Sequence, residues 1–240
     1  MIDLHCHILP ALDDGARDVE DSVEMARQAQ DDGIEAVCAT PHIRDDHDVP
    51  LEQIGARVAE LQDHVTAAEL DVRILTGGEL AQARAQRLSY TELRLATLGG
   101  GGRWLLLEPS PGPITAELAK TVRRLAAHGL QAIIAHPERH AGSDLEERLA
   151  ELVELGCLVQ WTAAFIADPS TADTALAFAR SGLLHVLGSD AHSARAGRPV
   201  RLAAGFASLA PVCSAERLAW IAERAPGAVI NGDPVAPPPP

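Results

Sequence analysis

Histidines and carboxylates recur in this sequence at a spacing that suits metal binding. His5 and His7 stand two residues apart near the N-terminus, and Asp190 and His192 repeat that spacing late in the chain. Side chains two residues apart lie on the same face of an extended strand. We therefore expect both members of each pair to enter one cavity, while Cys6 packs on the opposite face of its strand.

Residues of the same types follow four other hydrophobic runs. They are His42 in TPH, Glu79 in GGE, Glu108 in LLE and His136 in AHPER. If the runs are parallel strands of one barrel, their carboxyl ends meet on one face, where such enzymes place their sites. A lone histidine pair is more often a buried or capping pair, so the recurrence at six strand ends is what indicates a metal site.

These eight side chains form a nitrogen and oxygen ligand set without a thiolate. Such a set suits manganese, iron, cobalt or zinc in a catalytic cluster and differs from a structural zinc finger. Eight ligands exceed the needs of one ion. We therefore expect two or three ions, with carboxylates bridging between them.

The elements that would position these residues are strands alternating with helices. Val19, Val23, Ala26 and Ala29, for example, keep the spacing of an apolar helix face, and Gly33 follows as the expected stop. This rhythm predicts repeated βα units, an α/β fold with enough strands to close a barrel. The predicted strands are residues 2–7, 34–40, 72–76, 104–108, 132–135, 158–162 and 185–188.

Length and composition favour one domain. The chain has 240 residues and is 47% hydrophobic, which is enough for one sizeable core, so we expect a single domain over residues 1–232. The segment from about residue 208 should continue as helix. It should then end in an extended, flexible, proline-rich tail, residues 233–240, with no core to join.

The charge balance narrows the partners. A net charge of −14 argues against a nucleic-acid partner and against an anionic membrane surface, because both would repel the chain. No stretch approaches the ~20 apolar residues of a membrane span, and the N-terminus lacks a signal-peptide pattern. We therefore predict a cytoplasmic protein. Its four cysteines lack disulfide or zinc spacing, and we expect reduced thiols.

One alternative phosphatase chemistry can be weighed from the sequence. Cys38 and Arg44 have the C-x5-R spacing of cysteine-dependent phosphatases. Their loop cradles phosphate with backbone amides and usually contains glycine, whereas this segment has none and loses a donor at Pro41. We therefore expect Cys38 to pack within its strand.

A phosphate site in so acidic a chain needs local positive charge. Arg139 follows the HPE element, and Arg195 and Arg198 follow SDAH. Guanidinium groups grip phosphate oxygens in bidentate fashion, so all three are candidates for binding an anion. His47 and His140 are loop residues near the expected mouth that could line a substrate.

Taken together, the motifs resemble a known family. MIDLHCHILPALDDGA, ATPH, GGEL, LLE, IAHPER and GSDAH are similar to the PHP (polymerase and histidinol phosphatase) superfamily. Within it they most resemble the bacterial manganese-dependent protein tyrosine phosphatases of capsule and exopolysaccharide synthesis. The resemblance runs in order from residue 1 to about 198. It implies a distorted seven-stranded (β/α)7 TIM-like barrel of the PHP type with a trinuclear manganese centre.

The resemblance also implies roles for single residues. The ligands it implies are the eight chosen above: His5, His7, His42, Glu79, Glu108, His136, Asp190 and His192. The family's arginine after HPE corresponds to Arg139. Its second arginine corresponds to Arg198 with a one-residue shift in the loop, with Arg195 as the alternative.

The implied reaction is removal of phosphate from phosphotyrosine in the tail of a tyrosine autokinase. Hydroxide formed on the metal would attack phosphorus directly, without a covalent enzyme intermediate. The metals, Arg139 and Arg198 would neutralise the phosphate oxygens. Asp14, in the DDG turn, is a candidate catalytic proton donor or outer ligand, unless it only shapes the turn beside Gly15.

Two other functions stay open at this point. A small-molecule phosphatase of the same superfamily, such as one acting on histidinol phosphate, would use the same metals. A non-catalytic metal-binding regulatory module would need no complete ligand set, and the eight ligands argue against it. The sequence leaves open whether the chain forms a homo-oligomer.

Overall fold

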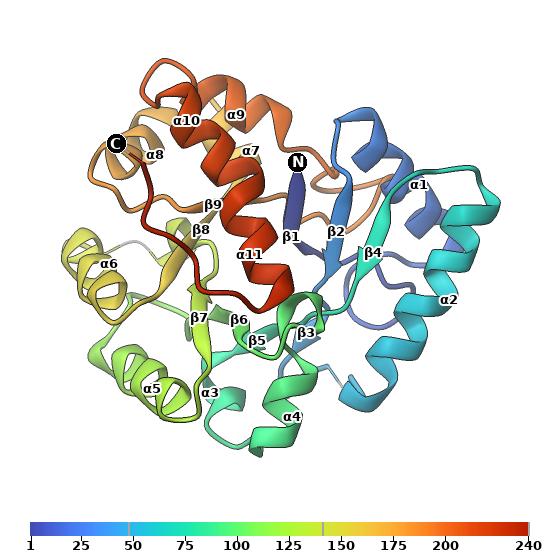
Figure 1. Ribbon diagram of the computed structural model, residues 1–240, viewed down its shortest axis with the longest axis horizontal. Helices are drawn as coiled ribbons and strands as arrows, with labels where there is room; N and C mark the ends of the chain where they lie inside the picture. Colours follow the sequence, from blue (N-terminus) through green and yellow to red (C-terminus); the bar gives the residue numbers. More distant parts are fainter. Residues whose placement is uncertain (48, 141, 240) are drawn as a thin grey trace.

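The computed structural model describes residues 1–47, 49–140 and 142–239. Within these residues nine short strands form a curled parallel sheet structure ringed by helices (Figure 1). The strands are β1 (Ile2–Cys6), β2 (Ala36–Ala39), β3 (His42–Ile43), β4 (Arg73–Leu75), β5 (Glu79–Ala81), β6 (Trp104–Glu108), β7 (Gln131–Ile134), β8 (Leu158–Thr162) and β9 (Val186–Gly188).

The strands fall into two parallel sheets that meet at β1. One sheet has the order β1-β2-β4, and the other has the order β3-β5-β6-β7-β8-β9. Near the ends of β1 and β9, the Asp190 amide donates to the His5 carbonyl and the His7 amide donates to the Ala191 carbonyl, both at 2.8 Å. These bonds bring the carboxyl ends of the first and last strands together. The mixed α/β class with a curled parallel sheet is therefore as predicted.

The predicted count of seven strands differs from the nine found in the described residues. β2 ends at Ala39 and β3 begins at His42, because Pro41 between them has no amide hydrogen for a sheet ladder. Residues 76–78, with two glycines, likewise separate β4 from β5. The two short strands, β3 and β5, pair with each other and start the larger sheet.

The helices surround the strands and, with them, bury the core. α1 shows how the sequence specifies one of them: the Asp18 side chain caps its first turn by accepting from the Asp21 amide at 2.8 Å. Met25, Ala26 and Ala29 form its buried face. The helices are α1 (Val19–Asp31), α2 (Ile54–Ala67), α3 (Gln82–Ala85), α4 (Tyr90–Leu95), α5 (Ala116–Ala127), α6 (Leu145–Glu154), α7 (Ala163–Ala167), α8 (Ala172–Arg180), α9 (Ala203–Leu209), α10 (Ala215–Ala219) and α11 (Ala225–Asn231).

Four further helical segments of other types lie among the described residues. They are the 3-10 turns η1 (Leu51–Gln53), η2 (Leu98–Gly100) and η3 (Pro137–His140), and the π-helical turn η4 (Trp220–Arg224) that joins α10 to α11. Among the helices of the described residues, none combines the length and the hydrophobicity that a membrane span requires.

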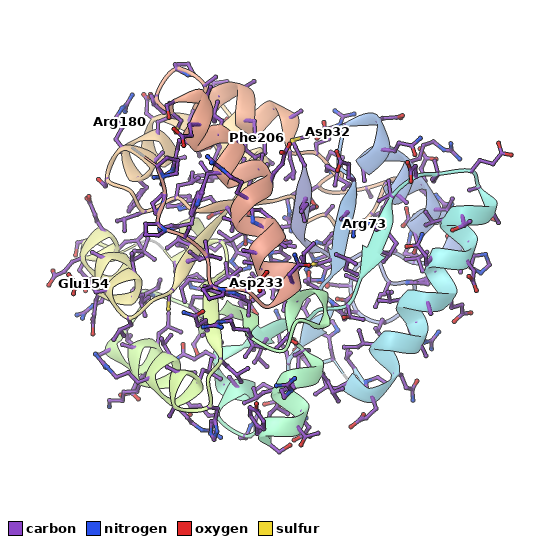
Figure 2. The ribbon with its side chains drawn as sticks, viewed as in Figure 1. Asp32, Arg73, Glu154, Arg180, Phe206 and Asp233 are labelled. Atoms are coloured by element: carbon purple, nitrogen blue, oxygen red, sulfur yellow. The ribbon has the colours of Figure 1, made fainter. Side chains whose placement is uncertain are left out.

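The helical C-terminal region is interrupted once. α9 ends at Leu209, and the next helix begins only at Ala215, where we expected one continuous helical stretch. Asp32, labelled in Figure 2 at the end of α1, accepts hydrogen bonds from the amides of Leu202 (2.6 Å) and Ala203 (2.9 Å) at the start of α9. A side chain far away in sequence thus caps this helix.

The C-terminal tail packs against the body of the protein. Its backbone carbonyls accept hydrogen bonds from two indole groups: Trp104 donates to Asp233 at 2.9 Å, and Trp220 donates to Ala236 at 3.2 Å. Val235 also packs against the core. Figure 1 shows α11 and the tail crossing the strands on the side where the N-terminus lies. The expectation that the tail has no core to join was therefore wrong.

Candidate metal centre

The eight predicted ligands lie together, most of them at the carboxyl ends of the strands. The structure places them as follows: His5 in β1 and His7 just after it, His42 and Glu79 at the first positions of β3 and β5, Glu108 at the last position of β6, His136 after β7, and Asp190 and His192 after β9. The parallel sheets are what bring residues from distant parts of the chain to one place.

Glu79 lies at the centre of the cluster and is fully buried. Its Oε1 is 2.6 Å from His136 Nε2, and its Oε2 is 2.7 Å from His42 Nδ1. The same Oε2 is 3.5 Å from His5 Nε2 and 3.4 Å from His7 Nε2. A buried carboxylate enclosed by four imidazoles could bind a metal ion together with them.

Asp190 joins the histidines to the arginines. Its Oδ1 lies 3.5 Å from His5 Nε2 and 3.6 Å from His7 Nε2. Its Oδ2 contacts the Arg139 guanidinium and lies 3.1 Å from Arg198 Nη2. The backbone φ is 50° at Asp190, a left-handed value that is costly for a residue with a side chain and that clusters at functional sites.

The possible ligand atoms form four groups that share members. Within each group the atoms lie within 4.8 Å of one another. The groups are His7, Asp14, His42 and His192; His5, His136 and Asp190; His5, His7 and Glu79; and His42, Glu79 and Glu108. Every predicted ligand belongs to at least one group. Shared members are what a cluster of neighbouring ions requires.

Several buried atoms of the cluster lack a hydrogen-bond partner. They include Glu79 Oε2 and Asp190 Oδ1. His42 Nδ1 also belongs here, because its 2.7 Å approach to Glu79 Oε2 lacks the angles of a hydrogen bond. Leaving a buried polar atom unpaired costs about 1–3 kcal/mol, so such atoms in one place indicate that they face a ligand.

The histidine tautomers support the same conclusion. His5 Nδ1 donates to Gln160 Oε1 at 3.0 Å, and His7 Nδ1 donates to Asp13 Oδ2 at 2.8 Å. In the neutral rings each Nε2 then carries a lone pair, and the two Nε2 atoms face each other at 3.2 Å. Two lone pairs at that separation repel each other unless a proton or a metal ion lies between them, and it is the usual separation of two ligands on one ion. The residues present therefore fit a metal cluster.

Two supporting residues were missed by the sequence analysis. Asp13 accepts from His7 Nδ1 and also from the His42 amide at 2.8 Å, so it orients one ligand and fixes the backbone of another. Gln160 accepts from His5 Nδ1 and lies within β8. A glutamine in the middle of the apolar strand LVQWT was the signal that could have found it.

The ionisation of the cluster follows from its burial and its charges. Burial lowers the pKa of His7, but hydrogen bonds to Asp13 and Glu79 outweigh it and raise the pKa to about 9. Burial and the charge of His7 lower the pKa of His192 to about 3. Burial and the charge of Glu79 raise the pKa of Glu108. A metal must displace the proton on His7, so metal affinity falls with decreasing pH.

The remaining predicted residues divide between the site and the surface. Asp14 is largely exposed at the mouth, and its Oδ1 lies 3.4 Å from His42 Nε2 and 3.5 Å from His192 Nε2. Arg198 reaches Asp190 and also donates through Nε to its carbonyl at 2.8 Å. Arg195 instead points to Asp18 at 3.3 Å, away from the cluster.

The cysteine alternative finds no support in the geometry. Cys38 is fully buried within β2, and burial raises the pKa of its thiol to about 12. A neutral thiol inside a strand cannot act as the nucleophile of a phosphate loop. The expectation that Cys38 packs in its strand is confirmed.

The two loop histidines lie beside the ligands. The His47 ring stacks on His42 with centroids 5.4 Å apart, and the buried His140 ring lies 6.0 Å from His136. Both therefore border the cluster without belonging to a ligand group.

The chain is similar to curated tyrosine phosphatases. It is 31% identical to the tyrosine-protein phosphatase YwqE of Bacillus subtilis over 81% of this chain and 78% of the relative. It is 25% identical to the tyrosine-protein phosphatase CpsB of Streptococcus pneumoniae over 80% of this chain and 83% of the relative.

Structural and family comparisons agree with these relatives. A solved structure from work on YwqE of Bacillus subtilis and CpsB of Streptococcus pneumoniae, described as metal-dependent tyrosine phosphatases, matches with a TM-score of 0.84 and 26% identity. The match covers 100% of this chain and 99% of that chain. The family described as "Capsular polysaccharide synthesis, CpsB/CapC" matches residues 1–231. The chain therefore belongs to the CpsB/CapC family, as the resemblance of its motifs implied.

Proposed function

We propose that this protein is a metal-dependent protein-tyrosine phosphatase that acts on the phosphotyrosine tail of a bacterial tyrosine autokinase. The observation that carries the proposal is the buried cluster of eight ligands with two arginines at its edge. The relatives' names and the description of the matching structure as metal-dependent tyrosine phosphatases support the same activity.

The proposed ligands are the eight clustered side chains, shared among two or three ions. A nitrogen and oxygen set of this kind suits manganese, our choice, and also iron, cobalt or zinc. When bound, the ions would lower the pKa of a water molecule and neutralise phosphate charge. Gln160 and Asp13 would hold His5 and His7 in the tautomer that leaves Nε2 free to bind.

Arg139 and Arg198 are proposed to bind the phosphate oxygens. Both reach Asp190, so a phosphate beside the cluster would meet two guanidinium groups held in place by one carboxylate. In a chain with a net charge of −14, this local positive charge is what can attract an anionic group. The guanidinium fork suits the equatorial oxygens of a phosphoryl group in transfer.

Asp14 is proposed to handle the proton of the leaving group. It is the exposed member of its ligand group, within 3.5 Å of His42 and His192, where the phenolic oxygen would depart. The phenol has a pKa of about 10, so proton donation to the leaving phenolate helps without being essential. Removal of Asp14 should therefore slow the reaction less than removal of Arg139.

We propose the location and the domain organisation that the sequence predicts. The protein would work in the cytoplasm, as a single domain over residues 1–232 followed by the tail. Joining β2 with β3 and β4 with β5 would turn the nine strands of the described residues into the seven of a distorted barrel.

A comparison of two substrates tests the proposed function. Hydrolysis of a phosphotyrosine peptide and of histidinol phosphate would be measured with manganese and with a chelator. We expect the peptide to be hydrolysed with manganese only. Chelator-sensitive turnover of histidinol phosphate with none of the peptide would contradict the proposal and assign a small-molecule substrate.

A further inference from the structure

The C-terminal tail accepts hydrogen bonds from the body of the protein at a regular interval. The accepting carbonyls stand three residues apart, and each meets a side-chain donor: Trp104 donates to Asp233 at 2.9 Å, Trp220 to Ala236 at 3.2 Å and Arg217 to Pro239 at 3.3 Å. A polyproline II helix has three residues per turn, so groups three residues apart lie along one of its faces. The spacing of the donors therefore matches a polyproline II segment.

The sequence of the tail favours the same conformation. Proline fixes its own φ near −65°, and it biases the residue before it towards extended or polyproline II backbone. Within residues 233–239, Val235 alone is neither a proline nor followed by one. Val235 and Pro238, again three residues apart, are half-buried, whereas Pro234 and Ala236 are exposed. The tail thus has the composition and the periodicity of a polyproline II ligand.

Contacts within the body of the protein hold the donors in place. Arg217 Nη2 donates to the Leu184 carbonyl at 2.9 Å, and its guanidinium lies over the Trp220 ring, 5.3 Å from the centroid. The edge of the Trp220 ring meets His185 with centroids 6.1 Å apart. Grooves lined by aromatic side chains are a common means of recognising proline-rich segments. We call the surface formed by Trp104, Arg217 and Trp220 the tail groove.

The tail leaves space in this groove. A cavity of about 310 Å³ lies between the tail and the body of the protein. Trp104, His185 and Trp220 are among the residues that line it on the body side, and residues 234–238 line it on the tail side. Apolar groups that face such a space lose dispersion contacts. A segment with a larger side chain in place of Val235 would therefore pack better than the tail does.

This cavity also separates two kinds of occupant. The tail of a second copy of this chain would leave the same space, and it would compete with a tail that is already tethered at high effective concentration. A different proline-rich segment with a larger apolar residue gains contacts that the tail does not make. The family match ends at residue 231, so the tail lies beyond the part of the chain that the family shares.

We propose that the tail groove is a recognition site for a proline-rich segment of a partner protein, and that the chain's own tail occupies it until such a segment displaces the tail. The segment adopts polyproline II conformation, presents carbonyls three residues apart and carries a larger apolar residue at the position of Val235. The site is separate from the proposed phosphatase site, because Trp104 begins β6 and Glu108 of the metal centre ends it.

The three tryptophans of the chain provide a test with an internal control. Trp104 and Trp220 donate to the tail, whereas the fully buried Trp161 donates to the Leu183 carbonyl at 3.0 Å. The three indole N–H signals of the isotope-labelled full chain would be followed by NMR while peptides are added. The peptides are the tail sequence DPVAPPPP, its leucine form DPLAPPPP and the proline-free control DALAAAAA.

We expect DPLAPPPP to shift the Trp104 and Trp220 signals to saturation and to leave the Trp161 signal unchanged. It should bind about fourfold more tightly than DPVAPPPP, because it buries one more methylene group. In the full chain carrying Pro237→Gly and Pro238→Gly, DPLAPPPP should bind at least about fourfold more tightly than in the wild type, because a less ordered tail competes less. An unchanged Trp161 signal in this variant reports that it is folded.

A further variant tests the role of the indole donor. Trp220→Phe keeps an aromatic ring and removes the N–H group, so it should weaken the binding of DPLAPPPP by about 3–10-fold, measured at the Trp104 signal. Unchanged affinity would contradict recognition through this donor.

Three results of the titration would overturn the proposal. If DPLAPPPP shifts neither signal in the wild type and in the glycine variant, the groove only packs the tail. If DALAAAAA produces the same shifts, the surface is a nonspecific apolar patch. If DPVAPPPP binds as tightly as DPLAPPPP, the groove is assigned to the tail of a second copy instead of a different partner.

Discussion

Asp13 shows how single residues outside the ligand set hold the centre together. One carboxylate accepts three hydrogen bonds, from His7 Nδ1 at 2.8 Å, from the His42 amide at 2.8 Å and from the Gly15 amide at 3.0 Å. The partners of metal-bound histidines typically change metal affinity or activity by 10–100-fold when they are replaced. Asp13 therefore fixes the ring of one proposed ligand and the backbone of another.

Replacing Asp13 by asparagine should weaken metal binding by about 10–100-fold, because an amide has one acceptor oxygen in place of two. Metal affinity would be measured by competition with a chromophoric chelator. Asp14→Asn is the matched control: its side chain is largely exposed, and it should change affinity less. Equal losses in the two variants would contradict the positioning role of Asp13.

His185 is a buried histidine outside the metal centre. Its Nδ1 accepts the Val159 amide at 3.2 Å, and its ring meets the edge of Trp220. Burial and the nearby charge of Arg217 lower its pKa to about 4. In the unfolded chain the value is about 6.5, so between these pH values the unfolded state binds one more proton.

Stability should therefore fall as the pH decreases from 7 to 5, with His185 accounting for about 2 kcal/mol of the loss. His185→Gln keeps an acceptor for the Val159 amide and removes the titration. Urea unfolding of both proteins at pH 7 and pH 5 gives the difference, in which contributions from the metal site cancel. An identical pH dependence in the two proteins would refute the assignment to His185.

The sequence predicted the eight residues that cluster at the site but not the residues that position them. Histidines and carboxylates at strand ends carry a type and a position that can be read directly. In the sequence Asp13 looked like part of a turn. The role of Gln160 depends on the strand order, in which β8 pairs with β9 and the end of β9 meets β1, so that Gln160 reaches His5. The sequence favoured Arg198 over Arg195, and in the structure Arg198 lies at Asp190 while Arg195 pairs with Asp18.

At the scale of elements, the end of α11 packs closely against the loop after η2 because glycines stand on both sides of the contact. Gly232 ends the helix in a left-handed conformation, with φ at 73°. A Cβ atom there would lie 2.1 Å from the Gly101 carbonyl oxygen, a backbone atom after η2. Gly227, inside the same helix, has nothing within 4 Å of the corresponding position.

The two glycines should respond in opposite directions to alanine. Gly232→Ala should lower the free energy of unfolding by at least about 1 kcal/mol, because it adds strain and a backbone clash. Gly227→Ala should raise it by about 0.5–1 kcal/mol, because alanine favours the helix. Thermal unfolding of both variants is the measurement. A stable Gly232→Ala protein would mean that α11 and the loop after η2 are less closely packed.

Strand prediction was accurate where strands are long enough to show a pattern. β6 and β8 have the bounds predicted for residues 104–108 and 158–162. β3 and β5 have two and three residues and follow β2 and β4 after short breaks, and they were missed as separate strands. They nevertheless position His42 and Glu79 opposite each other in register.

At the scale of the whole molecule, the tail and the metal centre lie at opposite ends. Trp104, which donates to the tail, begins β6, and Glu108 of the centre ends it, roughly 13 Å along the strand. The tail covers Trp104 and Trp220, which are almost completely buried. It should therefore contribute to stability and not to catalysis.

Deleting residues 233–240 should lower the free energy of unfolding by about 1–3 kcal/mol, because two indole groups lose their acceptors and become exposed. The kcat on a phosphotyrosine peptide at low temperature should stay within about twofold. Deleting only residues 237–240 keeps the carbonyls of Asp233 and Ala236 and should cost less. Tryptophan fluorescence during unfolding measures the loss of stability in both deletions. A large loss of kcat in the longer deletion would contradict the claim that the tail and the metal centre lie at opposite ends of the molecule.

The measurement that tests the central claim most directly is a metal titration of the chelated protein. Manganese would be returned stepwise, bound metal counted by mass spectrometry, and phosphotyrosine hydrolysis followed in the same samples, with Cys38→Ser alongside. We predict no activity without metal, recovery as two or three ions bind per chain, and the same recovery in Cys38→Ser. Full activity in metal-free protein, or its loss in Cys38→Ser, would contradict a metal-dependent reaction at this site.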